Sequence, residues 1–394
     1  MSTQFLAGAR VLVGGAWLDG HGVLVRGGTI AAVLPVTDAT AAGDRVDLPA
    51  GSLLSPGLVD VQVNGGGGLL FNDAPNAASA IAIADAHRAL GTTSILPTLI
   101  TDTPTAMARA ADAVCEAVGR ETGVLGIHYE GPFLAAGRPG VHDRALIRSP
   151  SEAELASLVA LAHRLAGPVL LTLAPETVGD AALRRLAGAG IVLAAGHSAA
   201  TYERATAALA AGITGFTHVF NAMPAASARE PGITAAALLD PASWCGVIAD
   251  GVHVHPAMLR LLLAAKPASR VMLVSDAMPS VGSPLPGFML QGRQVFRDHG
   301  RLALADGTLA GADICLADAV RFAVRLGLTA AQALTMATAV PAAFLRQAHR
   351  VGHIAAGARA DLLLLNPALE VLGTWRAGRF LGGPDILSVR AQAA

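Results

Sequence analysis

Four side chains capable of metal or proton chemistry stand at the ends of four short apolar runs: Glu130, His197, His218 and Asp276. Two imidazoles and one carboxylate are a common ligand set for a catalytic zinc ion, which keeps an open position for water. Such an ion lowers the pKa of that water, and a nearby carboxylate can take its proton. We therefore predict that Glu130, His197 and His218 hold a metal and that Asp276 handles the proton.

Each of these residues alone is weak evidence. A histidine beside an apolar strand more often makes a structural hydrogen bond than binds a metal, and a strand-terminal aspartate often caps a helix. The joint pattern carries the prediction, because the four groups occupy equivalent positions in four runs. His128 lies two residues before Glu130, so both side chains leave the same face of a strand. Since Glu130 is nearer the strand end, we predict that His128 supports the site from behind.

The elements that must position these residues repeat eight times in the middle of the chain. Short continuous apolar runs are typical of strands buried on both faces, and the alanine-rich stretches between them suit covering helices. Eight alternations favour a (β/α)₈ barrel over an open doubly wound sheet, and a barrel carries its functional residues at the carboxyl ends of its strands. The runs are residues 58–63, 94–99, 124–129, 168–173, 191–195, 213–218, 245–249 and 271–275.

The two ends of the chain have a different sequence pattern. Residues 8–54 are rich in β-branched and apolar residues broken by glycine pairs, and a similar pattern returns in 360–366 and 370–380. We predict one small β-sandwich domain from residues 1–54 and 350–394, and a barrel from 55–349. Within the barrel, we expect a glycine loop at 65–68, an inserted hairpin at 287–304, and two helices at about 312–326 and 329–347.

Composition excludes several classes of function. The chain has 394 residues, 53% hydrophobic and 14% charged, which predicts a large buried core. Its net charge of −1 gives no electrostatic reason to expect nucleic acid or a membrane surface as a partner. Three cysteines are too few for a disulfide framework. The first residues do not resemble a signal peptide and no apolar run reaches membrane-spanning length, so we expect a cytoplasmic protein.

The first apolar run lacks the His-x-His pair that supplies a second metal position in many metal-dependent barrel hydrolases. Gln62 and Asn64 stand there instead. Their neutral amides bind borderline metals poorly compared with imidazole. We therefore predict one catalytic metal ion per chain.

Segments that run nearly from end to end resemble the N-acetylglucosamine-6-phosphate deacetylases, a family within the amidohydrolase superfamily. The most specific are residues 130–132, which read Glu-Gly-Pro, and residues 218–223, which read His-Val-Phe-Asn-Ala-Met. The Gln-x-Asn form of the first strand resembles the single-metal branch of that family. Residues 278–281 depart from the small-residue stretch expected there, which bears on the shape of the acyl pocket.

The resemblance implies a role for each matching residue. It implies that Glu130, His197 and His218 bind one divalent metal, with zinc favoured and iron, manganese or cobalt also compatible. Asp276 is then the catalytic acid and base, and His142 polarises the acetyl carbonyl. Gln62, Asn64 and His128 support the site or position water. The implied substrate-contacting residues are His142, Asn221, Ala222, Arg229, His253, Leu309, Ala310 and Gly311.

The activity that the resemblance implies is removal of the N-acetyl group of N-acetylglucosamine 6-phosphate, giving glucosamine 6-phosphate and acetate. It also implies a homodimer, in which Arg229 reaches the sugar phosphate of its own or a neighbouring subunit. The alternatives are an N-acetylgalactosamine-6-phosphate deacetylase, another N-acyl or cyclic-amide hydrolase, and a non-catalytic sugar-phosphate sensor. The cyclic-amide branch uses a modified lysine between two metals, and the one lysine here, Lys266, is expected in a helix–loop region.

Overall fold

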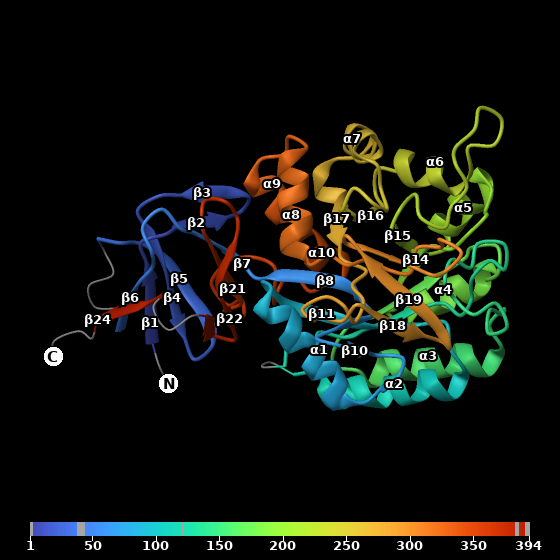
Figure 1. Ribbon diagram of the computed structural model, residues 1–394, viewed down its shortest axis with the longest axis horizontal. Coiled ribbons are helices and arrows are strands. Elements are labelled where there is room, and N and C mark those ends of the chain that lie inside the picture. The colour runs from blue at the N-terminus through green and yellow to red at the C-terminus, as the bar shows by residue number, and fades with distance from the viewer. Residues whose placement is uncertain (1–2, 38–43, 120–121, 383–385, 391–394) are drawn as a thin grey trace.

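The centre of the protein is a parallel barrel (Figure 1). The computed structural model describes residues 3–37, 44–119, 122–382 and 386–390. Eight parallel strands pair in the order β17-β16-β15-β14-β13-β12-β11-β8, and a bridge between Val63 and Ala277 joins the two edges, which nearly closes the sheet. The predicted barrel is confirmed. Its strands are β8 (Leu58–Val63), β11 (Thr92–Ile100), β12 (Ile127–Glu130), β13 (Val169–Leu173), β14 (Val192–Ala195), β15 (Ile213–Phe216), β16 (Trp244–Ile248) and β17 (Val271–Val274).

Helices cover the outside of the barrel, and polar side chains fix where several of them begin. The Ser151 side chain accepts from the Glu154 backbone in a reciprocal capping box. The Thr201 side chain accepts from the Arg204 backbone at the start of the helix α5 (Tyr202–Ala210). The helices are α1 (Ala77–Ala89), α2 (Pro104–Ala117), α3 (Glu152–Arg164), α4 (Asp180–Gly188), α5 (Tyr202–Ala210), α6 (Gly232–Leu239), α7 (Pro256–Ala265), η1 (Ala268–Arg270), α8 (Leu316–Arg325), α9 (Ala330–Met336) and α10 (Ala339–Phe344).

The single helix predicted at 329–347 is wrong, because the structure has two helices there. The break falls at Thr338, whose φ of −132° and ψ of −82° are not helical. Pro341 explains it, since a proline ring collides with the carbonyl four residues earlier, here that of Ala337. The preceding helix begins at Leu316, four residues later than predicted.

Strands from both termini form two further sheets beside the barrel, at the left of Figure 1. One sheet has the order β24-β6-β1-β4-β5 and the other β23-β22-β21-β7-β2-β3. Leu6 and Val23 of the first sheet share a core with Leu54 and Trp375 of the second. The strands are β1 (Thr3–Ala7), β2 (Arg10–Val13), β3 (Ala16–Leu18), β4 (His21–Arg26), β5 (Thr29–Pro35), β6 (Asp44–Asp47), β7 (Leu53–Pro56), β21 (Leu362–Leu365), β22 (Val371–Arg376), β23 (Arg379–Gly382) and β24 (Ser388–Arg390).

Two small sheets lie at the mouth of the barrel. The insertion expected to be a hairpin has three strands, β18 (Gly287–Leu290), β19 (Arg293–Asp298) and β20 (Arg301–Ala303). The glycine loop pairs as β9 (Gly65–Gly66) with β10 (Leu69–Leu70). Leu70, Met278, Leu290 and Leu302 form one apolar cluster, so the insertion packs over the strand ends. Among the residues that the structure describes, no helix is both long and apolar enough to cross a membrane.

Candidate metal and active site

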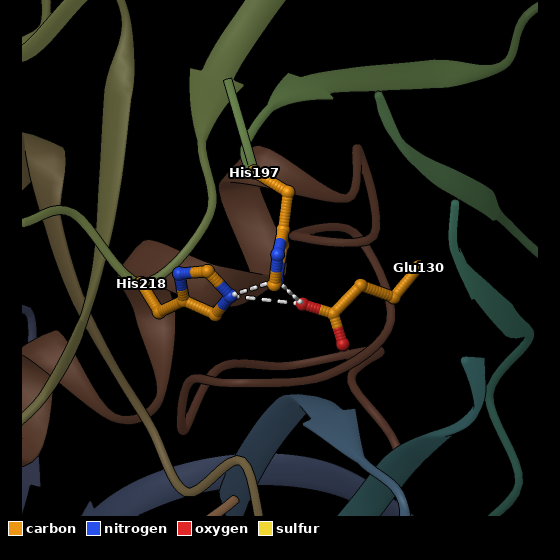
Figure 2. Close-up of side chains that lie close together, drawn as sticks. All are labelled: Glu130, His197 and His218. Carbon is orange, nitrogen blue, oxygen red and sulfur yellow. Dashed lines mark hydrogen bonds and ion pairs between the residues drawn. The ribbon is translucent and has the colours of Figure 1, made fainter. Parts of the chain in front are cut away.

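Three side chains converge at the carboxyl ends of three barrel strands (Figure 2). Glu130 ends β12, whereas His197 and His218 follow β14 and β15. The Nε2 atoms of His197 and His218 lie 3.1 and 2.8 Å from Glu130 Oε1, and 3.1 Å from each other. All three residues are buried. Ligand atoms around a tetrahedral zinc ion are about 3.3 Å apart, so the three atoms are spaced like one face of a coordination shell.

The hydrogen bonding of His197 shows that this cluster fits a metal ion. Its Nδ1 lies 3.0 Å from the carbonyl oxygen of Arg138, which can only accept, so Nδ1 carries the proton. Nε2 is then the ring nitrogen that faces the Glu130 carboxylate. A nitrogen and a carboxylate oxygen 3.1 Å apart share either a proton or a metal ion, so a metal ion can take the place of the proton here. This is the donor set and tautomer expected for a divalent metal site.

Burial by itself raises the pKa of Glu130, but hydrogen bonds from His197 and His218 outweigh it and hold the pKa well below the usual value. Burial likewise lowers the pKa of His218, and the hydrogen bond to Glu130 reverses the shift, so that its pKa is raised. Glu130 is therefore an anion at neutral pH. An ionised, buried carboxylate is what a cation site needs.

The backbone aims three of the site residues into the barrel mouth. His197, His218 and Asp276 each stand two residues beyond the last residue of their strands. All three have positive φ angles, of 48°, 30° and 50°. A residue other than glycine rarely adopts this conformation, which costs on the order of 1–3 kcal/mol and tends to occur at functional sites. The turn redirects the chain as soon as each strand ends.

Two amides hold Asp276. Asn64 Nδ2 and Gln62 Nε2 donate to Asp276 Oδ1 at 2.7 and 3.1 Å. Gln62 Nε2 also lies 3.1 Å from Glu130 Oε1, so this amide links the predicted ligand to the predicted base. Burial, followed by the negative charge of Glu130, raises the pKa of Asp276 to about 6. Both amides present N–H groups, not oxygens, to the carboxylates.

His142 is fixed in one tautomer by a residue that sequence reasoning missed. The backbone N–H of Thr101 donates to His142 Nδ1 at 3.3 Å, and the Thr101 hydroxyl lies 2.7 Å from the same nitrogen. Burial lowers the pKa of His142 to about 3, so the ring is neutral at pH 7. The ring proton is therefore on Nε2, which lies 3.9 Å from Glu130 Oε2. Thr101 directly follows β11, and that position was its only signal in the sequence.

His128 lies deeper in the barrel. Its Nδ1 and Nε2 lie 3.1 and 2.8 Å from the hydroxyls of Thr98 and Thr172, on the two neighbouring strands. Burial lowers the pKa of His128 to about 4. The neutral His128 ring, held by a hydroxyl on each side, therefore lies in the barrel interior behind Glu130.

A cavity of 410 Å³ opens in front of the ligand cluster. The cluster, Asp276 and His142 line it, together with five of the predicted substrate-contacting residues: Asn221, Ala222, His253, Leu309 and Gly311. Asp250 Oδ2 lies 2.6 Å from His253 Nδ1 and orients that ring. Sequence reasoning missed Ile100, Arg138, Leu290 and Thr308, which also line the cavity; Met278 lines it too, in the segment that departs from the family pattern.

Three residues considered in the sequence lie apart from this cavity. Ala310 is buried behind it, where its backbone N–H bonds Leu302. Arg229 is exposed on the loop before α6, and its neighbour Glu230 accepts from the backbone of Gly232. Lys266 follows α7, where its amine donates to Ser243 and Asp240. It does not bridge two metal positions.

Comparison with known proteins agrees with this geometry. The pattern of the amidohydrolase family matches residues 53–381. An N-acetylgalactosamine-6-phosphate deacetylase from Shewanella sp. strain ANA-3 is 40% identical over 378 residues, 95% of each chain. The human N-acetylglucosamine-6-phosphate deacetylase is 35% identical over 408 residues, covering 97% of this chain and 98% of the human one.

Solved structures of similar sequence share the whole fold. The N-acetylglucosamine-6-phosphate deacetylase from Pasteurella multocida superposes with a TM-score of 0.92 at 31% identity, covering 97% of this chain and all of the other. A mutant of the Mycobacterium smegmatis enzyme in complex with N-acetyl-D-glucosamine-6-phosphate gives a TM-score of 0.89 at 32% identity, with the same coverage.

Proposed function

Because this chain belongs to the amidohydrolase family, we propose that it hydrolyses the acetamido group of an amino-sugar 6-phosphate. The named substrate is N-acetylglucosamine 6-phosphate, and the products are glucosamine 6-phosphate and acetate. One observation carries the proposal: Glu130, His197 and His218 converge beside Asp276 in a single cavity. A sensor that only bound a sugar phosphate would have no use for a buried carboxylate placed to move a proton.

The residues of the chain divide the reaction among them. A metal held by the cluster would polarise the acetyl carbonyl and lower the pKa of water. Asp276 takes the proton from the attacking water and returns it to the leaving amine, the usual double role of one carboxylate. His142 donates a hydrogen bond from Nε2–H to the carbonyl oxygen as negative charge develops there, and it keeps the proton. Gln62 and Asn64 hold Asp276 Oδ1, which fixes the carboxylate for transfer.

The finer assignments are part of the same proposal. We assign zinc as the metal because the site offers two imidazoles and one carboxylate as ligands. We assign a homodimer because Arg229 is exposed, away from the cavity of its own chain. A charged sugar phosphate does not cross a bilayer unaided. The enzyme must therefore share a compartment with its substrate, which we propose is the cytoplasm.

The test of the substrate is acetate release, with metal content measured on the same sample. We expect release from N-acetylglucosamine 6-phosphate at about one metal ion per chain. N-acetylgalactosamine 6-phosphate is the second candidate, because the Shewanella relative that is 40% identical bears that name. A higher kcat/KM for the galactose epimer would transfer the assignment to it. No release from either sugar by metal-loaded protein would contradict the proposal.

Arg229→Gln is expected to raise KM by about tenfold or more and to leave kcat nearly unchanged. A guanidinium bound to phosphate is worth on the order of 1.5–3 kcal/mol, and it would act on substrate and transition state alike. Steady-state kinetics measures both constants, with Arg260→Gln, an exposed arginine on α7, as the matched control. An unchanged KM would remove Arg229 from the site. A co-expressed mixture of Arg229→Gln and Asp276→Asn chains regains the wild-type KM only if Arg229 acts across the subunit interface.

A further inference from the structure

The turn between β18 and β19 lies at the edge of the catalytic cavity. These two strands, drawn in orange in Figure 1, pair as an antiparallel hairpin in which Gln291 and Gly292 are the turn residues. Both turn residues have positive φ angles, of 47° and 78°, as in a tight two-residue hairpin. Leu290, directly before the turn, is buried in the apolar cluster at the barrel mouth and also lines the cavity. The turn is therefore anchored beside the site.

The side-chain amide of Gln291 joins two other segments of the barrel mouth. Its Nε2 donates to the backbone carbonyl oxygen of Thr101 at 2.7 Å. Its Oε1 accepts from the backbone N–H of Asp143 at 3.1 Å. These partners are 190 and 148 residues away along the chain, one directly after β11 and the other in the loop that follows β12. One amide thus uses both its donor and its acceptor to connect three parts of the fold.

The two segments that Gln291 connects are the ones that position His142. Asp143 directly follows His142 in the chain. Thr101 contacts the His142 ring itself, since its backbone N–H and its hydroxyl lie 3.3 and 2.7 Å from Nδ1. Gln291 therefore bonds both the backbone next to His142 and the residue that fixes the tautomer of its ring.

The loop that carries His142 has little support of its own. Residues 131–151, between the end of β12 and the start of α3, contain no helix or strand. Irregular segments are more mobile than the elements that they connect. Arg293, at the start of β19, donates from Nη2 to the backbone carbonyl oxygen of Val141. The hairpin therefore bonds the residues on both sides of His142.

We propose that Gln291 is a positioning residue that holds the His142 ring in line with the acyl carbonyl of the substrate. The role rests on the proposed function, in which Nε2–H of His142 donates to that carbonyl oxygen. Such a donor must be held to within about 0.5 Å of its productive position. Loss of one donor to a developing oxyanion costs about 10²–10³-fold in kcat. A loosened ring forfeits part of that factor, and Gln291 exerts its effect through Thr101 and Asp143.

The kinetic test is Gln291→Ala, with acetate release measured at saturating metal. We expect kcat to fall about tenfold, while KM and the metal content change by less than twofold, because neither the metal ligands nor the predicted phosphate contact is altered. The matched control is Gln294→Ala, an exposed position on β19 whose amide bonds Phe288 and Val295 within the inserted sheet. This control should keep kcat within twofold of the wild type. A kcat within twofold of the wild type in Gln291→Ala overturns the proposal.

A double-mutant cycle shows whether the effect passes through His142. His142→Gln should lower kcat by about a hundredfold or more, because it removes the donor itself. In that background, adding Gln291→Ala should lower kcat by less than a further twofold, since there is no imidazole left to position. If the two losses multiply instead, Gln291 supports the fold in general and the proposal fails. Should Gln291→Ala not fold, Gln291→Gly removes the same amide and tolerates the positive φ without strain.

The His142 ring also gives a readout that needs no substrate. The chain contains twelve histidines, and a ¹⁵N-labelled His142→Gln sample identifies the ring signals of His142 by their absence. In the wild type these signals should show one neutral tautomer with the proton on Nε2. Gln291→Ala should shift or broaden them, and Gln294→Ala should leave them in place; unchanged signals in Gln291→Ala overturn the proposal. If the protein released no acetate from either sugar, the proposed function would fail, and these signals would still decide whether Gln291 holds His142.

Discussion

Asp276→Asn is expected to lower kcat for acetate release by roughly a thousandfold or more while the metal content stays at about one per chain. General acid–base catalysis is typically worth 10²–10⁴-fold, and here one carboxylate serves both proton transfers. Asparagine has nearly the same shape, and its carbonyl oxygen can still accept from Gln62 and Asn64. The substitution therefore removes the proton acceptor and little else. Single-turnover acetate release measures the loss.

The matched control is Asp298→Asn on the inserted sheet, whose side chain is 83% exposed and which should keep the full rate. Retention of more than a tenth of the wild-type rate by Asp276→Asn would assign the base elsewhere.

The pH dependence of the wild-type rate is a second check on this assignment. Burial and the charge of Glu130 raise the pKa of Asp276 to about 6, and only the ionised form accepts a proton. Activity should therefore fall as the pH drops, with a midpoint at or below about 6, because a bound cation lowers this pKa.

Removal of the metal is expected to abolish acetate release and to lower the melting temperature. Without the metal, Glu130 and the two imidazoles stay buried together and keep only the hydrogen bonds between them. A ligand that binds only the folded state stabilises it by about 2.7 kcal/mol at a hundred times its Kd. Chelation followed by zinc titration, monitored by activity and thermal unfolding, measures both effects. One equivalent of metal should restore them together.

Glu130→Gln tests the ligand set directly. It should bind less than a tenth of an equivalent of metal and should not recover activity on zinc titration. Glu203→Gln, at an exposed position on α5, is the matched control and should retain the metal. Full activity in metal-free protein would refute the metal-dependent reaction. A requirement for two equivalents per chain would refute the single-metal prediction made from Gln62 and Asn64.

Local sequence patterns predicted the barrel strands well, and they placed the candidate site residues at the strand ends where the structure has them. Apolar runs bounded by polar residues determine where a buried strand can end, and His197, His218 and Asp276 lie just beyond such ends. The patterns could not show which side chains share a hydrogen bond. Gln62 and Asp276 are 214 residues apart, and nothing local shows that the Gln62 amide also contacts Glu130.

The features missed were those in which a single residue changes the local geometry. Pro341 divides a continuous helical pattern into α9 and α10. Gln291 and Gly292 turn the inserted chain an extra time, with φ angles of 47° and 78°, so three strands form where a hairpin was expected. Thr101 was missed because a threonine after a strand is common, and its value comes entirely from the distant His142.

The left-handed backbone at His197, His218 and Asp276 limits how the protein can be engineered for heat resistance. Glycine adopts positive φ without a steric penalty, so replacing any of these residues with glycine would relieve backbone strain. A library selected only for survival at high temperature would therefore tend to discard the side chains that we propose act in turnover. Natural proteins commonly trade stability for activity at such positions. Thermostable variants of this barrel should instead come from its helices and terminal sheets, with the three strained residues held constant.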